Sequence, residues 1–181
     1  MKKMLIILLC SLGMSACNSM KIENYSNSTI QLDIFDYFEG QTLAWGIFQD
    51  RFGNVKKQFR VEITGTIEND ILTLIEYFEY SDGSKDKRVW KINKNSRNKY
   101  DGSADDIIGT AIGVSNGNAL NWKYEMDLKI GKRTIRVDFN DWMFLQKDMV
   151  LINIARVSKW GLKLGEVNIF FIKPKNGFSN S

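Results

Sequence analysis

The chain has 181 residues, of which 44% are apolar, 25 are Lys or Arg and 21 are Asp or Glu. It contains two cysteines and no histidine. Without histidine the chain cannot build a Ser-His-Asp or Cys-His catalytic centre, nor a zinc site that uses histidine. Chemistry is therefore restricted to carboxylates or to a metal ion with oxygen ligands.

The first residues carry the pattern of an export signal. Lys2 and Lys3 precede an apolar run over residues 4–12. That run is far shorter than the ~20 apolar residues of a membrane-spanning helix, so it is typical of a signal peptide instead. Residues 1–16 are expected to be removed.

The run ends in Met14-Ser15-Ala16-Cys17. Two small residues directly before a cysteine are typical of a bacterial lipoprotein signal, so we expect Cys17 to become the first residue of the mature chain and to receive acyl chains, palmitate among them. A secretory signal that is cleaved without lipidation is the alternative.

Removal of the signal limits the chemistry further. Cys10 leaves with it and Cys17 would carry lipid, so no disulfide can form despite an oxidising export route. The signal takes two of the 25 basic side chains and none of the 21 acidic ones. Because the remaining charges nearly balance and are interspersed, no nucleic-acid partner is expected.

The rest of the chain predicts one β domain. Residues 17–29 are rich in Ser and Asn and are expected to form a lipidated flexible tether. Segments of alternating apolar and polar residues, separated by turn signals, then fill residues 30–175, and residues 176–181 form a short tail. No long segment has a helical period, so the pattern indicates an antiparallel meander.

The clearest predicted strand covers residues 119–130, where apolar and polar residues alternate. Gly131-Lys132 then suits a two-residue type II′ turn. This turn predicts apolar pairs on the inner face and an opposite-charge pair on the outer face. The pairs are Leu128 with Ile135, Met126 with Val137, Tyr124 with Phe139, Trp122 beside Asp141, and Asp127 with Arg136.

Four other turn signals predict further hairpins, at Gly53-Asn54, Asp82-Gly83, Asn116-Gly117 and Trp160-Gly161. An odd-length turn would reverse the face of a strand. The expected inward pairs are Phe48 with Phe59, Gly46 with Val61 and Ala44 with Ile63; Ile75 with Trp90, Tyr77 with Arg88 and Thr73 with Ile92; Gly113 with Leu120, Ala111 with Trp122 and Gly109 with Tyr124; Ile154 with Val167, Ile152 with Ile169, Val150 with Phe171 and Arg156 with Gly165.

Five hairpins give about ten strands, and a meander of this length either closes or leaves two exposed edges. We therefore predict a mainly β fold, an antiparallel meander that closes into a lipocalin- or calycin-like barrel of about eight to ten strands. A two-sheet β-sandwich is the alternative.

Several segments, in order along the chain, resemble a known family. They are FEGQTLAWGIFQDRFG, YFEYSDG, RVWKI, YDGSADDIIGTAIG, GNALNWKY, DFNDWMFL and NIARVSKWGLKLGEVNIFF. The chain resembles an uncharacterised family of Gram-negative lipoproteins, catalogued as domain of unknown function 3833. It departs from the family at Asn140, where an acidic residue is usual before Asp141-Trp142. The resemblance implies an envelope lipoprotein and supplies no activity.

Polar side chains on an apolar face are informative, and by these registers they are Arg88, Asp141 and Arg156. We hypothesise that they meet the polar head of a bound amphiphile in a cavity. In the alternative, they lie at the barrel ends and pair with the backbone or with one another. The apolar wall of the cavity would come from Trp90, Trp122 and Tyr124.

An acidic group offers a less favoured hypothesis, a carboxylate-based hydrolase. Turn, capping and surface roles are the favoured interpretation of these acids, and their spacing matches no EF-hand calcium loop. We therefore expect a protein that is not an enzyme and that uses no metal and no cofactor. The acids are Asp105, Asp106, Asp138 and Asp141.

The favoured function is that of a non-catalytic binding lipoprotein for a lipid or another hydrophobic small molecule. The alternative is a structural or interaction lipoprotein, whose outer face contacts an envelope protein through Ile108, Ile112 and Val114. Because Asn18 follows Cys17, rather than an aspartate, we expect an anchor in the outer membrane of a Gram-negative bacterium, facing the periplasm.

Overall fold

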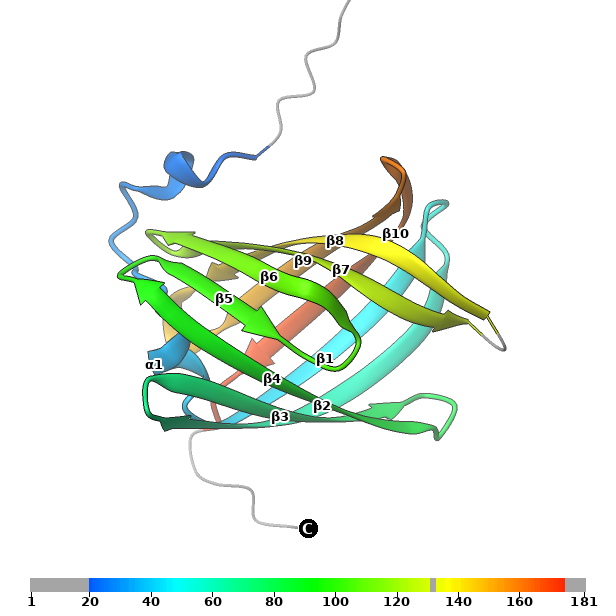
Figure 1. The fold of residues 1–181 in the computed structure, drawn as a ribbon, viewed down its shortest axis with the longest axis horizontal. Helices are drawn as coiled ribbons and strands as arrows, with labels where there is room; N and C mark the ends of the chain where they lie inside the picture. The colour runs from blue at the N-terminus through cyan, green and yellow to red at the C-terminus, as the bar shows by residue number, and fades with distance from the viewer. Residues whose placement is uncertain (1–19, 131–132, 175–181) are drawn as a thin grey trace, which may run out of the picture.

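The computed structural model describes residues 20–130 and 133–174 and is dominated by one antiparallel sheet (Figure 1). The expected signal peptide, Cys17, the Gly131-Lys132 turn and the tail 176–181 lie outside these ranges. No helix within them is long and apolar enough to cross a membrane.

The strands are β1 (Gly40–Asp50), β2 (Val55–Glu68), β3 (Ile71–Tyr80), β4 (Lys85–Ser96), β5 (Lys99–Ser103), β6 (Ile107–Asn116), β7 (Ala119–Ile130), β8 (Arg133–Leu145), β9 (Leu151–Lys159) and β10 (Leu162–Ile172). The short helices are η1 (Ile22–Tyr25), α1 (Ile34–Phe38) and η2 (Lys147–Met149).

The ten strands close into a barrel. Each strand pairs with its neighbour along the chain, and β10 returns to pair with β1. Closure gives every one of these strands a hydrogen-bonded partner on each side, although the short β5 pairs only with residues 91–96 of β4 and 111–114 of β6. The barrel prediction is confirmed, and the alternative of a two-sheet sandwich is excluded.

The β7–β8 hairpin has the predicted register. Leu128 pairs with Ile135, and Trp122 pairs with Asp141 on the inner face. On the outer face Arg136 Nε lies 3.1 Å from Asp127 Oδ1. Alternation alone placed these side chains correctly because the hairpin carries no bulge.

The predicted face of β3 is wrong. Its hairpin with β4 closes through the three-residue loop Ser81-Asp82-Gly83, in which Gly83 has φ of 82°. The odd-length loop shifts the register by one residue, so Glu76 pairs with Arg88 in place of Tyr77. Leu74 likewise replaces Ile75 opposite Trp90, and Leu72 replaces Thr73 opposite Ile92.

The predicted face of β9 is also wrong, although its turn is correct. Lys159 pairs with Leu162 around Trp160-Gly161, as expected. A bulge between Lys163 and Gly165 then shifts the register by one residue. Arg156 consequently pairs with Glu166 on the outer face and is exposed. The inward pairs are Ala155 with Val167, Asn153 with Ile169 and Leu151 with Phe171.

In the β1–β2 and β6–β7 hairpins the inward faces are as predicted, but the pairings nearer the turns are displaced by two residues. In β6 a bulge between Ile108 and Ile112 restores the predicted register, so Ile107 pairs with Met126. Gly46 pairs with Phe59, and Gly113 pairs with Trp122. A Cβ atom on either glycine would overlap the aromatic ring of its partner. Glycine opposite a large ring therefore gives the barrel interior its space for aromatic side chains.

Helix α1 closes one end of the barrel (Figure 1). Asp33 is its N-cap and accepts a hydrogen bond of 3.0 Å from the backbone nitrogen of Phe35, while its other carboxylate oxygen pairs with Lys94. Tyr37 donates to the carbonyl of Met149 at 2.9 Å. The helix is too short to leave a periodic signal in the sequence. Its buried side chains, with one that precedes it, are Leu32, Ile34, Phe35, Tyr37 and Phe38.

The segment before α1 lies against the barrel. The Tyr25 ring lies 5.9 Å from that of Trp142 and 5.2 Å from that of Phe144. The backbone nitrogen of Leu32 donates to Gly117 O at 2.8 Å. The expected tether of residues 17–29 therefore includes a portion that contacts β8.

Candidate functional site

The two halves of the barrel interior differ in how deeply their side chains are buried. Near α1 the inward-facing Leu72, Tyr100 and Leu151 are at most 1% exposed. Towards the opposite end, several large side chains on the same inner faces are only partly buried, although Met126, Val137 and Val157 remain buried there. We call this half of the interior the cup, and define it by Phe59, Phe78, Tyr80, Tyr124, Leu128, Phe139 and Ile169.

Aromatic rings form two walls of the cup. On β2 and β3 the ring centres of Phe59, Phe78 and Tyr80 are 5.9 to 6.1 Å apart. On β7 and β8 the ring of Tyr124 stacks on that of Phe139 at 5.0 Å. These partly exposed rings offer apolar contact area to a ligand.

Trp90 and Trp122 lie deeper, between the cup and the closed half. Trp90 is 7% exposed and Trp122 is 4% exposed. The Trp90 ring centre lies 5.6 Å from that of Tyr124 and 5.9 Å from that of Trp122. The two indoles therefore separate the cup from the core beneath it.

Arg88 of β4 forms an ion pair inside the cup. Its Nη2 and Nε lie 2.7 Å and 3.1 Å from the same oxygen, Oδ2 of Asp106. The guanidinium carbon lies 5.7 Å from the ring centre of Phe78. Glu76 faces Arg88 across the β3–β4 ladder. Burial raises the pKa of Glu76 to about 7, while Arg88 opposes this shift and Asp106 adds to it.

Asp141 of β8 is a second buried acid, with 5% exposure. The Tyr124 hydroxyl donates to its Oδ2 at 3.3 Å. Burial raises the pKa of Asp141 to about 7, and hydrogen bonding from Asn153 and Tyr124 and the charge of Arg88 oppose the shift. Glu76 and Asp141 are therefore both poised to change charge near neutral pH.

The buried polar groups of the cup leave acceptors without donors. Within the described residues, Asp106 Oδ1, Asp141 Oδ1 and Asn153 Oδ1 have no hydrogen-bond partner. The Asn153 and Asp141 side chains lie within reach of each other, so rotation of the Asn153 amide would pair these two, and Asp106 Oδ1 is the acceptor that depends on a donor from elsewhere. Buried acceptors without a partner are unfavourable and uncommon in native proteins. The cup is thus suited to a group that brings N–H or O–H donors.

The structure brings five of the six predicted cavity residues together. Arg88, Trp90, Trp122, Tyr124 and Asp141 all face the barrel interior. Aromatic or polar contacts connect the last four, while Arg88 pairs with Asp106. Arg156 does not belong to the group, because the bulge in β10 turns it outward.

Sequence reasoning missed Glu76 and Asn153, and it interpreted Asp106 as turn chemistry. Glu76 was missed with the register of β3, and Asn153 with the register of β9. An isolated glycine within a strand often marks a bulge, so Gly165 was the signal that could have placed Asn153 inside.

The acids of the hydrolase hypothesis do not share one face. Asp106 pairs with Arg88 and Asp141 faces the interior, whereas Asp105 and Asp138 are exposed. Across residues 20–130 and 133–174 no group of acidic side chains is arranged to hold a metal ion. The structure therefore does not gather these four acids into one carboxylate site.

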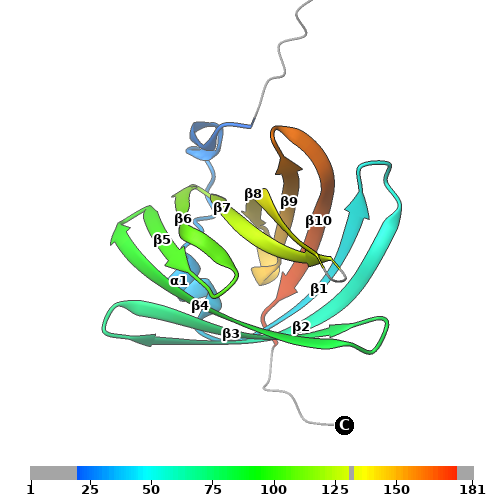
Figure 2. The same ribbon diagram turned by 45° about the vertical axis from the view of Figure 1, so that its right-hand side comes forward.

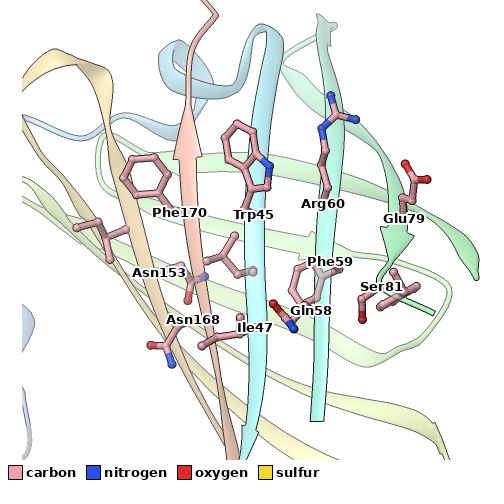
Figure 3. A pocket seen from close by; sticks show the side chains of 14 residues that line it. Trp45, Ile47, Gln58, Phe59, Arg60, Glu79, Ser81, Asn153, Asn168 and Phe170 are labelled. Carbon is pink, nitrogen blue, oxygen red and sulfur yellow. The ribbon is translucent and has the colours of Figure 1, made fainter. Parts of the chain in front are cut away.

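A groove of about 690 Å³ runs across β9, β10, β1, β2 and β3 (Figure 3). Outward-facing side chains line most of it, and it also reaches Phe59, Tyr80 and Ile169 of the cup. Trp45, Phe170 and Ile152 form an apolar row along it, because Trp45 pairs with Phe170 and Phe170 with Ile152. These three side chains are 37 to 42% exposed. In contrast, of the predicted outer patch only Ile112 is exposed, while Ile108 and Val114 are partly buried.

Comparison with known proteins identifies a family and a similar fold. The family model described as "protein of unknown function (DUF3833)" matches residues 11–173. A search of curated proteins gave no match. Among solved structures, the barrel is similar to an S-type phycobiliprotein lyase from Guillardia theta, with a TM-score of 0.54 and 9% identity. That similarity covers 78% of this chain and 91% of the lyase. At this identity it concerns the fold alone.

Proposed function

The chain belongs to the DUF3833 family, and for this member we propose that the barrel holds a hydrophobic or amphiphilic small molecule in its cup without catalysing a reaction. The observation that carries the proposal is the contrast between the closed half and the cup. Inward-facing Phe59, Phe78 and Phe139 remain partly exposed although the same strands bury their side chains nearer α1. Large apolar groups left open to solvent inside a barrel favour a ligand that covers them.

The polar groups indicate which end of the ligand lies deepest. Its apolar part would contact the rings of Phe59, Phe78 and Phe139. Its polar end would donate hydrogen bonds to Asp141 and Asp106, whose Oδ1 atoms have no donor from the described part of the chain. A hydroxyl, amide or ammonium group fits these acceptors, while a ligand carboxylate would be repelled by three nearby acids and attracted by Arg88 alone.

The similarity to the phycobiliprotein lyase supports only the architecture, since a closed barrel of this size leaves room for a small molecule. We further propose that Cys17 is lipidated and anchors the barrel to the outer membrane on its periplasmic side. The small residues before Cys17, and Asn18 after it, support this location.

Ligand binding is tested by mass spectrometry of whatever copurifies with the native protein, followed by titration with fluorescent alkyl amines, alcohols and acids. We expect the amine and the alcohol to bind more tightly than the acid. Replacement of Asp141 with Asn and of Phe78 with Ala should weaken binding by about tenfold each. Arg156→Gln is the matched control, because Arg156 lies on the outer face and should leave binding unchanged.

An empty protein that binds none of the three probes would contradict the proposal. Membrane anchoring is tested separately by Cys17→Ser, which should release the protein from the membrane fraction. Retention of the variant in that fraction would contradict lipidation at Cys17.

An interaction role is the second candidate, and the outer groove favours it. Trp45, Phe170 and Ile152 expose an apolar row next to Arg60 and Glu79. An envelope protein bound there would be detected by a photo-crosslinker at position 45 and lost on Phe170→Ser. The control position is 77, which is also exposed but lies outside the groove.

A further inference from the structure

The ends of two neighbouring hairpins carry the most exposed large apolar side chains of the described chain. Trp160 is 87% exposed, Phe52 76% and Leu162 67%. Phe52 lies in the β1–β2 turn, and the other two lie at the β9–β10 turn. Because β1 pairs with β10 as far as Asp50 and Gly165, the two turns are adjacent at the mouth of the cup. We call residues 51–57 and 159–163 together the hairpin ends.

The fold gives no reason for a tryptophan at position 160. Its φ is 51°, and that of the following Gly161 is 78°, as a type I′ turn requires. Asn, Asp and Gly adopt this left-handed conformation readily, whereas a bulky side chain there is strained. Trp160 therefore combines an unfavourable backbone with an almost fully exposed indole, which indicates a contact outside the chain.

Basic side chains surround these apolar groups. The hairpin ends contain Arg51, Lys56, Lys57, Lys159 and Lys163, and they contain no acid. The flanking acids are already engaged, since Asp50 pairs with Lys56 and Glu166 with Lys163. The surface is therefore both apolar and positively charged.

Two of these cations lie directly over the exposed aromatic rings. The Arg51 guanidinium lies 4.8 Å from the ring centre of Phe52, and the Lys159 ammonium lies 4.8 Å from that of Trp160. A bilayer interface takes aromatic rings at the level of its headgroups and lysine or arginine at its phosphates. This pairing of ring and cation matches an anionic lipid surface better than an apolar protein surface.

The placement of the hairpin ends supports the same partner. Figure 2 is turned about the vertical axis of Figure 1, and both views place η1 and the β1–β2 and β9–β10 turns on the upper side of the barrel. The β3–β4 hairpin lies lower in both. One membrane plane on that upper side can therefore contact the hairpin ends on the same side of the barrel as η1.

We propose that the hairpin ends dock the mouth of the barrel on an anionic phospholipid bilayer, with Trp160, Phe52 and Leu162 in the interface and the surrounding cations at lipid phosphates. The docking goes beyond ligand binding, and it requires neither a filled cup nor an acyl chain. Combined with the proposed function, it would open the cup towards the membrane, where amphiphiles are dissolved.

The test uses residues 17–181 with Cys17→Ser, so that neither the signal nor an acyl chain contributes. This chain keeps every described strand and every residue of the core. Its sedimentation is measured with phosphatidylethanolamine vesicles that contain or lack phosphatidylglycerol. We expect partition onto the anionic vesicles and a decrease on addition of salt.

Substitution separates the apolar from the electrostatic contribution. Phe52→Ser and Trp160→Ser should each reduce partition by about tenfold, and the charge variant R51Q/K159Q should remove most of the preference for phosphatidylglycerol. Ile112→Ser is the matched control, because Ile112 is 53% exposed on a different wall. Thermal unfolding of each variant verifies that the barrel is intact.

Equal partition of wild type and F52S/W160S, or no partition of either, would overturn the proposal. So would a dimer that forms through the hairpin ends and dissociates in the double variant, because a second copy would then be the occupant. The two proposals fail separately. Cup variants such as Phe78→Ala should leave vesicle binding unchanged, and the hairpin-end variants should leave probe binding in vesicle-free solution unchanged.

Discussion

The closed half of the barrel and the cup are built from the same ten strands, yet they meet solvent differently. At the closed end, α1 covers the strands and the interior is apolar around Leu72, Leu120 and Leu151. In the cup no helix covers the described strands, and the interior holds Glu76, Arg88 and Asp141. The short helix α1 thus distinguishes the two halves: the half that it covers forms the core, and the uncovered half forms the candidate binding site.

The largest expected effect comes from removing the cap. Phe38 is 5% exposed and its ring meets that of Phe171 edge-on at 5.7 Å. Phe38→Ala should lower the free energy of unfolding by about 3–5 kcal/mol, because it leaves a cavity where the core is closed. Phe78→Ala is the matched variant in the cup and should lower it by less than half as much. Denaturant unfolding measures both, and equal losses would contradict the division of the interior.

A smaller effect should appear as a dependence on pH. The pKa of Glu76 is raised to about 7 in the folded state, so the folded chain binds more protons than the unfolded chain between pH ~4.5 and ~7. Its stabilising contribution is therefore present at low pH and is lost as pH rises through about 7. Glu76→Gln should remove about 1–3 kcal/mol of this decrease between pH 5 and 8.

Asp141→Asn should further reduce the dependence of the unfolding free energy on pH. The Asp141 carboxyl also has a pKa of about 7, because it is buried. Glu79→Gln is the control, because Glu79 lies on β3 but points outward and is exposed. Unfolding curves recorded across this pH range give the difference directly. A wild-type slope retained in Glu76→Gln would show that Glu76 is ionised in the folded state.

A smaller loss of stability at the closed end is expected from removing the N-cap of α1. Asp33→Ala removes the hydrogen bond to the backbone of Phe35 and the ion pair with Lys94. We expect a loss of about 0.5–2 kcal/mol, with faster hydrogen exchange in α1 and unchanged exchange in the strands around the cup. Asp36→Ala, at an exposed position of the same helix, should cost less.

The smallest effect is expected on the outer surface. Arg136 and Asp127 form an ion pair between β7 and β8, and both side chains are substantially exposed. Asp127→Asn should cost about 0.2–1 kcal/mol at low ionic strength and less at high salt. A larger cost, measured by thermal unfolding at two salt concentrations, would mean that this pair holds the hairpin in register.

The contrast between hairpins explains how much the sequence could predict. The β7–β8 register was correct because a two-residue turn and strict alternation agree, and no bulge intervenes. Ile71 to Tyr80 offers no such check, since apolar residues occupy both faces and the turn alone sets the register. The barrel, which depends on the number of strands, could therefore be predicted when individual faces could not.

The residues of the candidate site could likewise be predicted only where the register of their hairpin was correct. Trp122, Tyr124 and Asp141 follow from the well-determined hairpin, and Arg88 and Trp90 follow from alternation within β4. Arg156 was misplaced by one bulge beside Gly165. The difference between the closed half and the cup depends on α1, whose five residues leave no periodic signal.

The order of the strands has a consequence for how the chain folds. Every strand pairing except one joins neighbours along the chain, and the exception joins β1 to β10. During synthesis β1 is made first, so one of its edges stays unpaired until nearly the whole domain has been made. Pairing of residues 162–172 with β1 is thus the step that closes the barrel. A chain that ends before these residues would leave one edge of β1 and one edge of β9 without a hydrogen-bonded partner. We expect such a chain to aggregate or to be degraded, and not to form a smaller barrel.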